Sequence, residues 1–183
     1  VIPDKMAKTL FIGGNQQQLD DIQSIYPDTQ RLDILVDDTM DSLISKLQQH
    51  NSVNHIIWMA PTDSLDKTSF ISSQQQGVLQ LFKLIKSLLG VSYGTKNLAW
   101  TVLTTQTQKV LTTDQVNPTH AGFHGLIGAV AKEYGKWAIR IVDLQQDWPL
   151  PLDEIFSLPH SAEGNTLAFR DKEWFAQELL AVN

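Results

Sequence analysis

The feature that most constrains this chain is a regular alternation between short apolar runs and segments with helical periodicity. Five apolar runs read as strands, at 9–12, 32–36, 55–60, 98–103 and 138–142. Segments with apolar residues at helical spacing separate them, as in Met40, Leu43, Ile44 and Leu47. Strands that alternate with helices form parallel sheets with helical crossovers. We therefore predict an α/β fold with a doubly wound parallel sheet.

Several of the predicted helices carry recognisable ends. Asn15 can cap the first helix, with Gln18 three residues later in the capping-box position. The second helix begins behind Asp38 or Thr39. The longest helix spans about 70–89, and its apolar positions cover more than one narrow stripe. That breadth predicts contact with the sheet on one side and with another helix on the other.

The alternation stops after Pro149 and Pro151. A short helix at about 153–158 is followed by two apolar runs, 166–169 and 174–176, separated by a polar turn. These two runs predict a C-terminal β-hairpin that extends the sheet. We expect residues 1–183 to form a single domain.

Composition excludes several classes of function. The chain has 183 residues, no cysteine and a formal net charge of −6. Without cysteine there is no disulfide, thiolate metal site or cysteine nucleophile. Nucleic-acid binding calls for a basic patch, and the apolar runs are too short to span a membrane. We therefore expect a cytoplasmic protein that binds neither nucleic acid nor membranes.

A doubly wound sheet raises the question of a bound dinucleotide. The fingerprint needs three spaced glycines and a phosphate on a helix N-terminus. Here Gly13 and Gly14 are followed by Asn15 and a run of glutamines, and the third glycine is missing. Asp37 or Asp38 could bind a ribose, or could equally start the next helix. We predict that no cofactor is bound.

The catalytic pair of a short-chain reductase is also missing. Such an enzyme uses a tyrosine as its acid, with a lysine four residues later that lowers the tyrosine pKa. The residues four positions after Tyr26, Tyr93 and Tyr134 are glutamine, asparagine and alanine. We therefore predict a chain with no catalytic residues, which is not an enzyme by itself.

Two other motifs have both functional and structural interpretations. Asn117-Pro118 opens a predicted helix on which His120 and His124 stand at the i, i+4 spacing of a zinc pair. No third ligand is nearby, so we predict no metal and instead helix capping or an interdomain contact. Gly125 and Gly128 on the same helix indicate close packing against this domain or against a partner.

Several stretches together resemble one family. They are 76–89, 93–108, 117–128, 131–134 and 139–144. They look like the ketoreductase regions of modular polyketide synthases, and they resemble most the trans-acyltransferase class of these synthases. In that family a ketoreductase has two Rossmann-like halves, of which the N-terminal one is truncated and lacks cofactor and active site. This chain resembles that half only, and 169–175 is similar to the strands that precede the catalytic half.

The resemblance implies a structural role. The favoured function is a scaffold that braces a catalytic ketoreductase half or spaces neighbouring domains of the same polyketide synthase. The chain could also be a pseudo-ketoreductase that stands alone between active domains. The alternative is an NADPH-dependent oxidoreductase with an atypical glycine loop. The two missing motifs favour the scaffold.

A scaffold acts through its surfaces, so two helices are candidates for a partner interface. Both have more apolar residues than one sheet contact requires. The candidate interface residues are Leu81, Phe82, Ile85, Phe123 and Ile127. The alternative is that these side chains are all buried within this domain, in which case the interface lies elsewhere.

Overall fold

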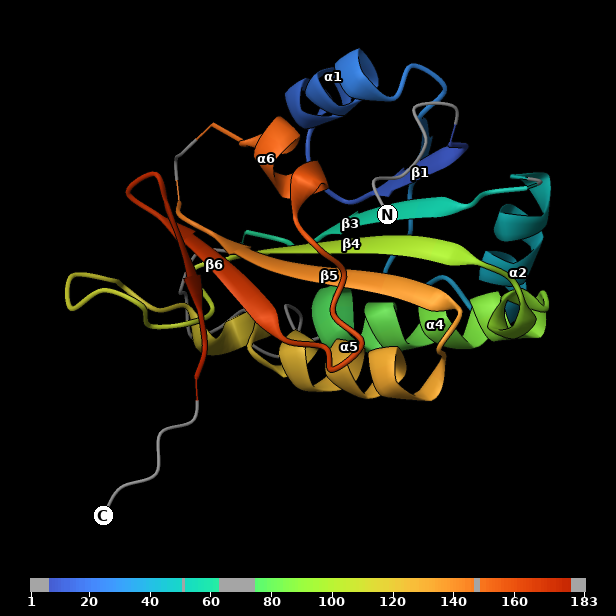
Figure 1. Ribbon diagram of the computed structural model, residues 1–183. Helices are drawn as coiled ribbons and strands as arrows, with labels where there is room; N and C mark the ends of the chain where they lie inside the picture. Colours follow the sequence, from blue (N-terminus) through green and yellow to red (C-terminus); the bar gives the residue numbers. More distant parts are fainter. Residues whose placement is uncertain (1–6, 51, 63–74, 147–148, 179–183) are drawn as a thin grey trace.

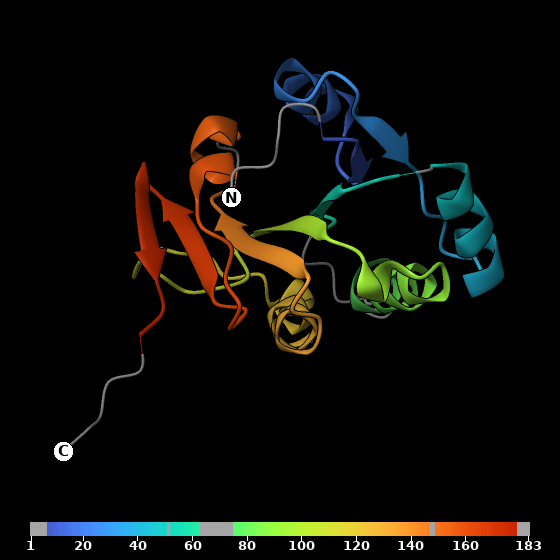
Figure 2. The ribbon, with the colours of Figure 1, turned by 45° about the vertical axis from the view of Figure 1, so that its right-hand side comes forward.

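The computed structural model describes residues 7–50, 52–62, 75–146 and 149–178. Its strands form one seven-stranded sheet in the order β2-β1-β3-β4-β5-β6-β7 (Figure 1). Neighbouring strands are parallel throughout, except for the antiparallel last pair. The predicted fold class is confirmed, with a doubly wound parallel sheet that ends in a β-hairpin. Figure 2 shows this hairpin at the end of the sheet opposite β2.

The element bounds follow the alternation in the sequence. The strands are β1 (Thr9–Ile12), β2 (Gln30–Leu32), β3 (His55–Met59), β4 (Leu98–Thr105), β5 (Trp137–Leu144), β6 (Thr166–Arg170) and β7 (Glu173–Ala176). The α-helices are α1 (Gln16–Ile25), α2 (Met40–Gln49), α4 (Gln80–Gly90), α5 (Gly122–Glu133) and α6 (Leu152–Ser157). A π-helical turn (Gln75–Leu79) precedes α4, and 3₁₀ turns (Tyr93–Thr95, Pro118–His120) precede β4 and α5.

Helices cover both faces of the sheet and create two cores. Because side chains alternate along a strand, Leu10 and Ile12 point to one face and Phe11 to the other. The first face packs against α2, α4 and α5, and the second against α1 and α6 (Figure 1). Both faces are therefore apolar, as a parallel sheet buried between two helical layers requires.

The second strand differs from the prediction. It covers Gln30–Leu32 rather than 32–36. The Asp38 carboxylate accepts the Leu35 backbone N–H at 2.7 Å, and the Asp38 N–H donates to the Leu35 carbonyl at 3.2 Å. This turn ends the extended backbone before α2, so Leu35 and Val36 lie on the surface instead of in the sheet.

The longest predicted helix is interrupted. Residues 70–74 lie outside the described part of the chain, and the remainder is the π-helical turn followed by α4. Gly77 has non-helical backbone angles, with φ −96° and ψ −107°. A Cβ at this position would lie 2.8 Å from His120 Nδ1. The break thus occurs where the backbone passes too close to a buried side chain for any residue larger than glycine.

The two glycines of α5 have different roles. Gly128 faces the 161–164 turn, where Gly164 has a φ of +70°. A Cβ on Gly164 would lie 2.3 Å from the Gly128 Cα, so two backbones touch here. A Cβ on Gly125 would meet nothing within 4 Å. Close packing within the domain therefore explains Gly128 and Gly164 but not Gly125.

This difference predicts opposite effects of two alanine substitutions. Gly164→Ala should lower the free energy of unfolding by at least about 1 kcal/mol, because a left-handed backbone disfavours a Cβ. Gly125→Ala should raise it by about 1 kcal/mol, because alanine favours the helix and has free space there. Urea denaturation of both variants measures the two effects. Equal stability of the two variants would contradict this account.

Candidate functional site at the carboxyl edge of the sheet

Open α/β sheets bind ligands outside the carboxyl ends of their strands, at the point where the strand order reverses. In this sheet the reversal lies between β1 and β3. A crevice of about 340 Å³ lies there. Its lining residues come from the turn after β1, the first turn of α1, the end of β3 with the residues after it, and the start of α4: Gly13, Gly14, Asn15, Gln18, Trp58, Met59, Ala60, Pro61, Thr62 and Gln80. In a nucleotide-binding protein of this fold, the nucleotide would lie in this crevice.

The glycine turn after β1 is packed against its own domain. Gly13 and Gly14 have φ values of +81° and +63°. A Cβ on Gly13 would lie 2.3 Å from the Met59 carbonyl oxygen, and one on Gly14 would lie 2.5 Å from the Phe11 ring. The turn therefore needs both glycines for its own packing, without any phosphate.

The N-terminus of α1 is closed by the predicted capping box, which is confirmed. Asn15 Oδ1 accepts the Gln18 backbone N–H at 3.0 Å, and Gln18 Oε1 accepts the Asn15 N–H at 2.8 Å. A dinucleotide phosphate binds at a helix N-terminus through such free backbone donors. Here side chains of the same turn occupy two of them.

The acid after β2 belongs to the start of α2. Asp38 is buried and accepts hydrogen bonds from Lys46 Nζ at 2.6 Å and Ser42 Oγ at 2.5 Å. Burial opposes ionisation of this carboxyl, but the hydrogen bonds from Lys46, Ser42 and Leu35 outweigh it and lower its pKa to about 2. Of the two interpretations of Asp38, the structure supports the start of the helix. Asp37 is exposed.

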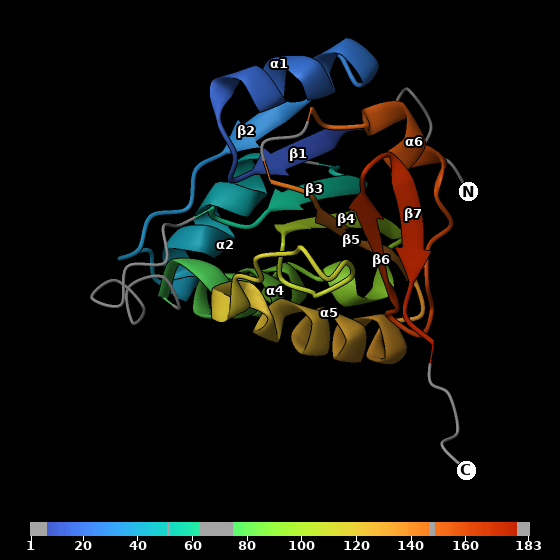
Figure 3. The same ribbon diagram turned by 90° about the vertical axis from the view of Figure 1, so that its left-hand side faces the viewer.

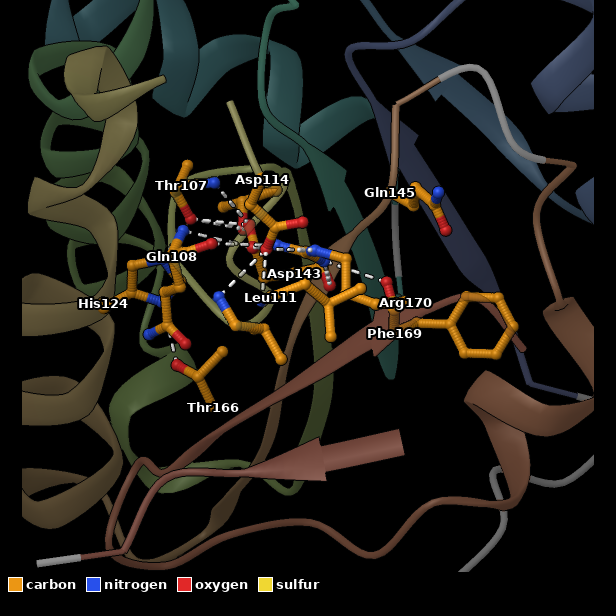
Figure 4. Close-up of polar contacts among 12 residues, drawn as sticks. Thr107, Gln108, Leu111, Asp114, His124, Asp143, Gln145, Thr166, Phe169 and Arg170 are labelled. Carbon is orange, nitrogen blue, oxygen red and sulfur yellow. Dashed lines mark hydrogen bonds and ion pairs between the residues drawn. The ribbon is translucent and has the colours of Figure 1, made fainter. Parts of the chain in front are cut away.

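The other half of the carboxyl edge, where β4 and β5 end, holds a buried polar network (Figure 4). At its centre, Asp143 Oδ1 accepts the Thr104 hydroxyl at 2.6 Å and the Thr107 hydroxyl at 2.6 Å. Asp143 Oδ2 accepts the Gln108 N–H at 3.2 Å and Arg170 Nη2 at 2.6 Å. Burial raises the pKa of Asp143, but these hydrogen bonds outweigh it, and the net pKa is lowered.

Arg170 uses its whole hydrogen-bonding capacity in this network. Its Nε donates to Asp114 Oδ2 at 3.1 Å, and its Nη1 donates to the carbonyls of Asp143 and Phe169 at 2.9 Å. Its Nη2 donates to the Gln108 carbonyl at 3.0 Å as well as to Asp143. A guanidinium has five N–H donors, so none is left for a ligand.

A histidine connects this network to the last parallel strand. His124 Nε2 lies 2.6 Å from Thr107 Oγ1, and its Nδ1 lies 2.8 Å from Thr166 Oγ1. Since the Thr107 hydroxyl donates to Asp143, it accepts from Nε2–H. When the ring is neutral, Nδ1 then accepts the Thr166 hydroxyl. Burial lowers the pKa of His124, although the Asp143 charge acts in the opposite direction.

The three tyrosines lie far from this edge. Tyr26, Tyr93 and Tyr134 each stand between the end of a helix and the start of the next strand. They are therefore at the amino edge of the sheet, opposite the carboxyl edge where reductases hold their substrates. Burial raises the pKa values of Tyr26 and Tyr93.

Comparison with known proteins finds sequence similarity to polyketide synthases. PksN, a polyketide synthase of Bacillus subtilis (strain 168), is 36% identical over 179 residues, which are 96% of this chain and 3% of PksN. PksM, a polyketide synthase of the same strain, is 38% identical over 159 residues, which are 87% of this chain and 4% of PksM. The chain therefore spans a small fraction of the length of these relatives. No family model matches it.

A solved ketoreductase structure has a similar fold. The first ketoreductase of the tylosin polyketide synthase superposes with a TM-score of 0.68 at 14% identity, over 92% of this chain and 37% of that one. The chain is similar in sequence to segments of two polyketide synthases and has a ketoreductase-like fold. This confirms the family resemblance that the sequence motifs indicated.

The residues of the polar network in this ketoreductase-like subdomain were missed by sequence reasoning. Asp143 and Arg170 are 27 positions apart, and Asp114 lies in a loop without a recognisable motif. The available signal was a charged residue at the end of each of two apolar strands, Asp143 after 139–142 and Arg170 after 166–169. Buried charges require partners, but the sequence does not say which.

The two histidines singled out by their spacing serve separate purposes. His124 belongs to the polar network, whereas His120 stacks on Phe123 with ring centroids 5.2 Å apart. The cap of the turn is Asn117, whose Oδ1 accepts the Thr119 N–H at 3.0 Å, and not a histidine. The expected interdomain contact stays a prediction. Among the described residues, no group of three His, Asp or Glu is placed to hold a metal ion.

The candidate interface needs a correction. Leu81, Ile85, Phe123 and Ile127 are buried in the core of the domain, between 0% and 4% exposed. The broad apolar surface of these helices is used by the sheet and by contact between helices, so these four side chains are unavailable to a partner. Phe82 is 49% exposed, so its role in a partner interface stays a prediction.

Within the described ranges, no helix is long and apolar enough to cross a membrane.

A second buried polar cluster lies beneath α1 and α6. His55 is fully buried, with edge-on ring contacts to Tyr26 and Phe156. Its Nδ1 lies 3.4 Å from Thr9 Oγ1. Burial, together with the positive charge of Arg140 and a smaller effect of His160, lowers the pKa of His55 to about 3. His55 is therefore neutral in the folded protein.

The buried ion pair predicts a large cost for removing one partner. Asp143→Asn should lower the free energy of unfolding by about 3–5 kcal/mol, because it leaves the Arg170 charge buried without its counterion. The matched control is Asp33→Asn, which breaks the partly exposed Arg31–Asp33 pair of 2.7 Å. That change should cost less than about 1 kcal/mol. Urea denaturation at pH 7 compares the two, and equal costs would contradict the role of the network.

His55 predicts a pH dependence of stability. The unfolded histidine binds a proton below its ordinary pKa of 6.5, but the folded one does so only near its lowered pKa of about 3. The stabilisation is complete above pH 6.5 and falls by about 1.4 kcal/mol per pH unit as pH decreases toward 3. Urea denaturation between pH 7 and pH 4.5 measures this slope. In His55→Phe the slope should be smaller by that amount, and an unchanged slope would contradict the assignment.

Proposed function

We propose that this subdomain is a non-catalytic scaffold in polyketide biosynthesis, which braces a catalytic ketoreductase half or spaces neighbouring domains of the same synthase. The observation that supports this most directly is the state of the carboxyl edge. Where a reductase holds cofactor and substrate, the described residues bond to one another: the capping box at α1 and the Asp143–Arg170 network at β4 and β5.

The residues at the crevice do not fit a nicotinamide dinucleotide. Atoms of Met59 and Phe11 occupy the space beside the two glycines. The side chains of Asn15 and Gln18 accept hydrogen bonds from two of the backbone N–H donors at the start of α1. Asp38, the buried acid after β2, is held by Lys46 and Ser42. The described residues of the crevice therefore do not form a site for hydride transfer from a nicotinamide.

The tyrosines, His124 and Asp143 do not suit acid–base chemistry either. A general acid must reach the reacting atom at the carboxyl edge. The tyrosines lie at the opposite edge, and His124 and Asp143 have their bonding positions filled by threonines and Arg170. The described residues instead form two apolar cores around one sheet, which suits a structural element of a cytoplasmic multienzyme of the trans-acyltransferase type.

One observation favours the alternative, an NADPH-dependent oxidoreductase. Arg31 lies on β2, and its Nη2 donates to the Gly14 carbonyl at 3.2 Å. An arginine near this position accommodates the 2′-phosphate in NADP-binding folds. However, its Nε is paired with Asp33 at 2.7 Å. A single cation beside a closed helix N-terminus supplies one contact of the several that a dinucleotide needs.

Titration with NADPH separates the two functions. The scaffold predicts no saturable change of NADPH fluorescence or calorimetric heat in the micromolar range, where a routine cofactor affinity of about −8 kcal/mol would be seen. A catalytic ketoreductase titrated in parallel is the positive control. Saturable micromolar binding that weakens in Arg31→Ala would overturn the scaffold in favour of the enzyme.

A further inference from the structure

One polar side chain from each of four neighbouring strands lies on the sheet face that α1 and α6 cover. They are Thr9 of β1, His55 of β3, Thr101 of β4 and Arg140 of β5, and all four are buried. The register places Thr9 beside His55 and Thr101 beside Arg140. We call these four residues the polar row. Figure 3 shows α1 and α6 together on this face, opposite α4 and α5.

Hydrogen bonds connect the polar row from one end to the other. Arg140 Nη1 donates to Thr101 Oγ1 at 3.3 Å, and Thr101 Oγ1 lies 3.4 Å from His55 Nε2. At the other end the Thr9 hydroxyl donates to the Ala7 carbonyl at 3.3 Å, so it accepts from His55 Nδ1–H. When the His55 ring is neutral, its Nε2 then accepts the Thr101 hydroxyl.

Arg140 also binds the carboxyl end of α6. Its Nη2 donates to the Phe156 carbonyl at 3.3 Å and to the Leu158 carbonyl. Its Nε donates to the Leu158 carbonyl at 3.1 Å. Phe156 lies in the last turn of the helix, and Leu158 is its C-cap. The last carbonyls of a helix have no partner within the helix, so the guanidinium supplies the donors that attach α6 to the sheet.

The charge of Arg140 has no carboxylate beside it among the described residues. All its hydrogen bonds go to backbone carbonyls and to the Thr101 hydroxyl. Tyr26, His55 and His160 are the titratable groups around it. The acids of the two covering helices are exposed or partly exposed: Asp20, Asp21, Asp153 and Glu154. A second positive charge in this core would therefore be uncompensated.

Two histidines could bring that second charge. The His55 ring is covered by Phe156 of α6, with ring centroids 5.8 Å apart, and by Tyr26 at the end of α1. His160 follows α6, and its Nε2 is buried without a hydrogen-bond partner among the described residues. Burial and the Arg140 charge lower the pKa of His55 to about 3 and that of His160 to about 4. Both rings are therefore neutral while α6 is in place.

We propose that α6 and the segment after it, residues 152–160, form a latch that Arg140 holds closed and that acid opens as a unit. Opening removes the Phe156 ring from His55 and exposes Arg140, so that water solvates every positive charge. The core on the opposite face of the sheet stays folded. The latch stands independently of the scaffold function, because it depends on the attachment of one helix and not on the carboxyl edge.

Amide hydrogen exchange of the 183-residue chain, followed by NMR between pH 7 and pH 4.5, tests the latch. The Ile155 and Leu158 amides, which donate within α6, should have lower protection factors than the amides of β4 at each pH. Below pH 6.5 the opening constant of α6 should rise at least about tenfold per pH unit, because only the open form binds a proton on His55. Protection of α6 that does not depend on pH, or that equals that of β4 throughout, overturns the proposal.

Two variants separate the hydrogen bonds of the latch from its pH dependence. Arg140→Lys keeps the charge but loses the fork that reaches both carbonyls, so α6 protection at pH 7 should fall at least about tenfold and still decrease with acid. His55→Phe should make the rise of the opening constant about tenfold per pH unit smaller. The matched control is His50→Phe, at the partly exposed end of α2, which should change neither quantity.

The titration of the His55 ring, followed by NMR in the unmodified chain, does not depend on whether a variant folds. Its ring signals should not titrate between pH 7 and pH 5 while α6 is protected. A His55 that titrates near pH 6.5 with α6 still protected overturns the latch. So does an α6 whose pH dependence His55→Phe leaves unchanged, or whose protection Arg140→Lys does not lower.

Discussion

The rest of this structure depends on the buried ion pair between Asp143 and Arg170. Neither side chain is exposed at all, and their closest atoms are 2.6 Å apart. Removing two charges from water is expensive, so such a pair is stable only where further hydrogen bonds satisfy both groups. Here two threonine hydroxyls, two backbone N–H groups and four other acceptors supply those bonds.

These bonds explain how a truncated sheet stays ordered at its last strands. β6 pairs with β5 over three register positions, a short ladder for the end of a parallel sheet. Arg170 at the end of β6 binds β5 through Asp143 and the 106–114 loop through Gln108 and Asp114. The hairpin with β7 is thus tied to the centre of the sheet by charge as well as by packing. The same bonds occupy the donors and acceptors of the network itself, so among the described residues Asp143 and Arg170 have none left for a substrate.

The sequence predicted the elements that depend on local rules. The capping box of Asn15 and Gln18, the short helix after Pro151 and the C-terminal hairpin all follow from residue types at fixed spacings. Prediction failed where a side-chain contact, near or distant in the sequence, overrides the pattern of apolar residues. Leu35 and Val36 have the composition of a strand, but Asp38 bends their backbone into a turn. At Gly77 the helix is interrupted, and His120, 43 positions later, occupies the space that a Cβ would need there.

For the site, the sequence by itself determined an absence of motifs: no third glycine and no tyrosine–lysine pair. These follow from reading spacings along the chain, and they need no coordinates. Only the tertiary structure decided what takes the place of those motifs. It brought Asp114, Asp143 and Arg170 together from three segments, buried four of the five candidate interface residues, and left Phe82 on the surface. The physical reason is that burial and charge pairing depend on distances between segments remote in the chain, and no periodicity within one segment encodes them.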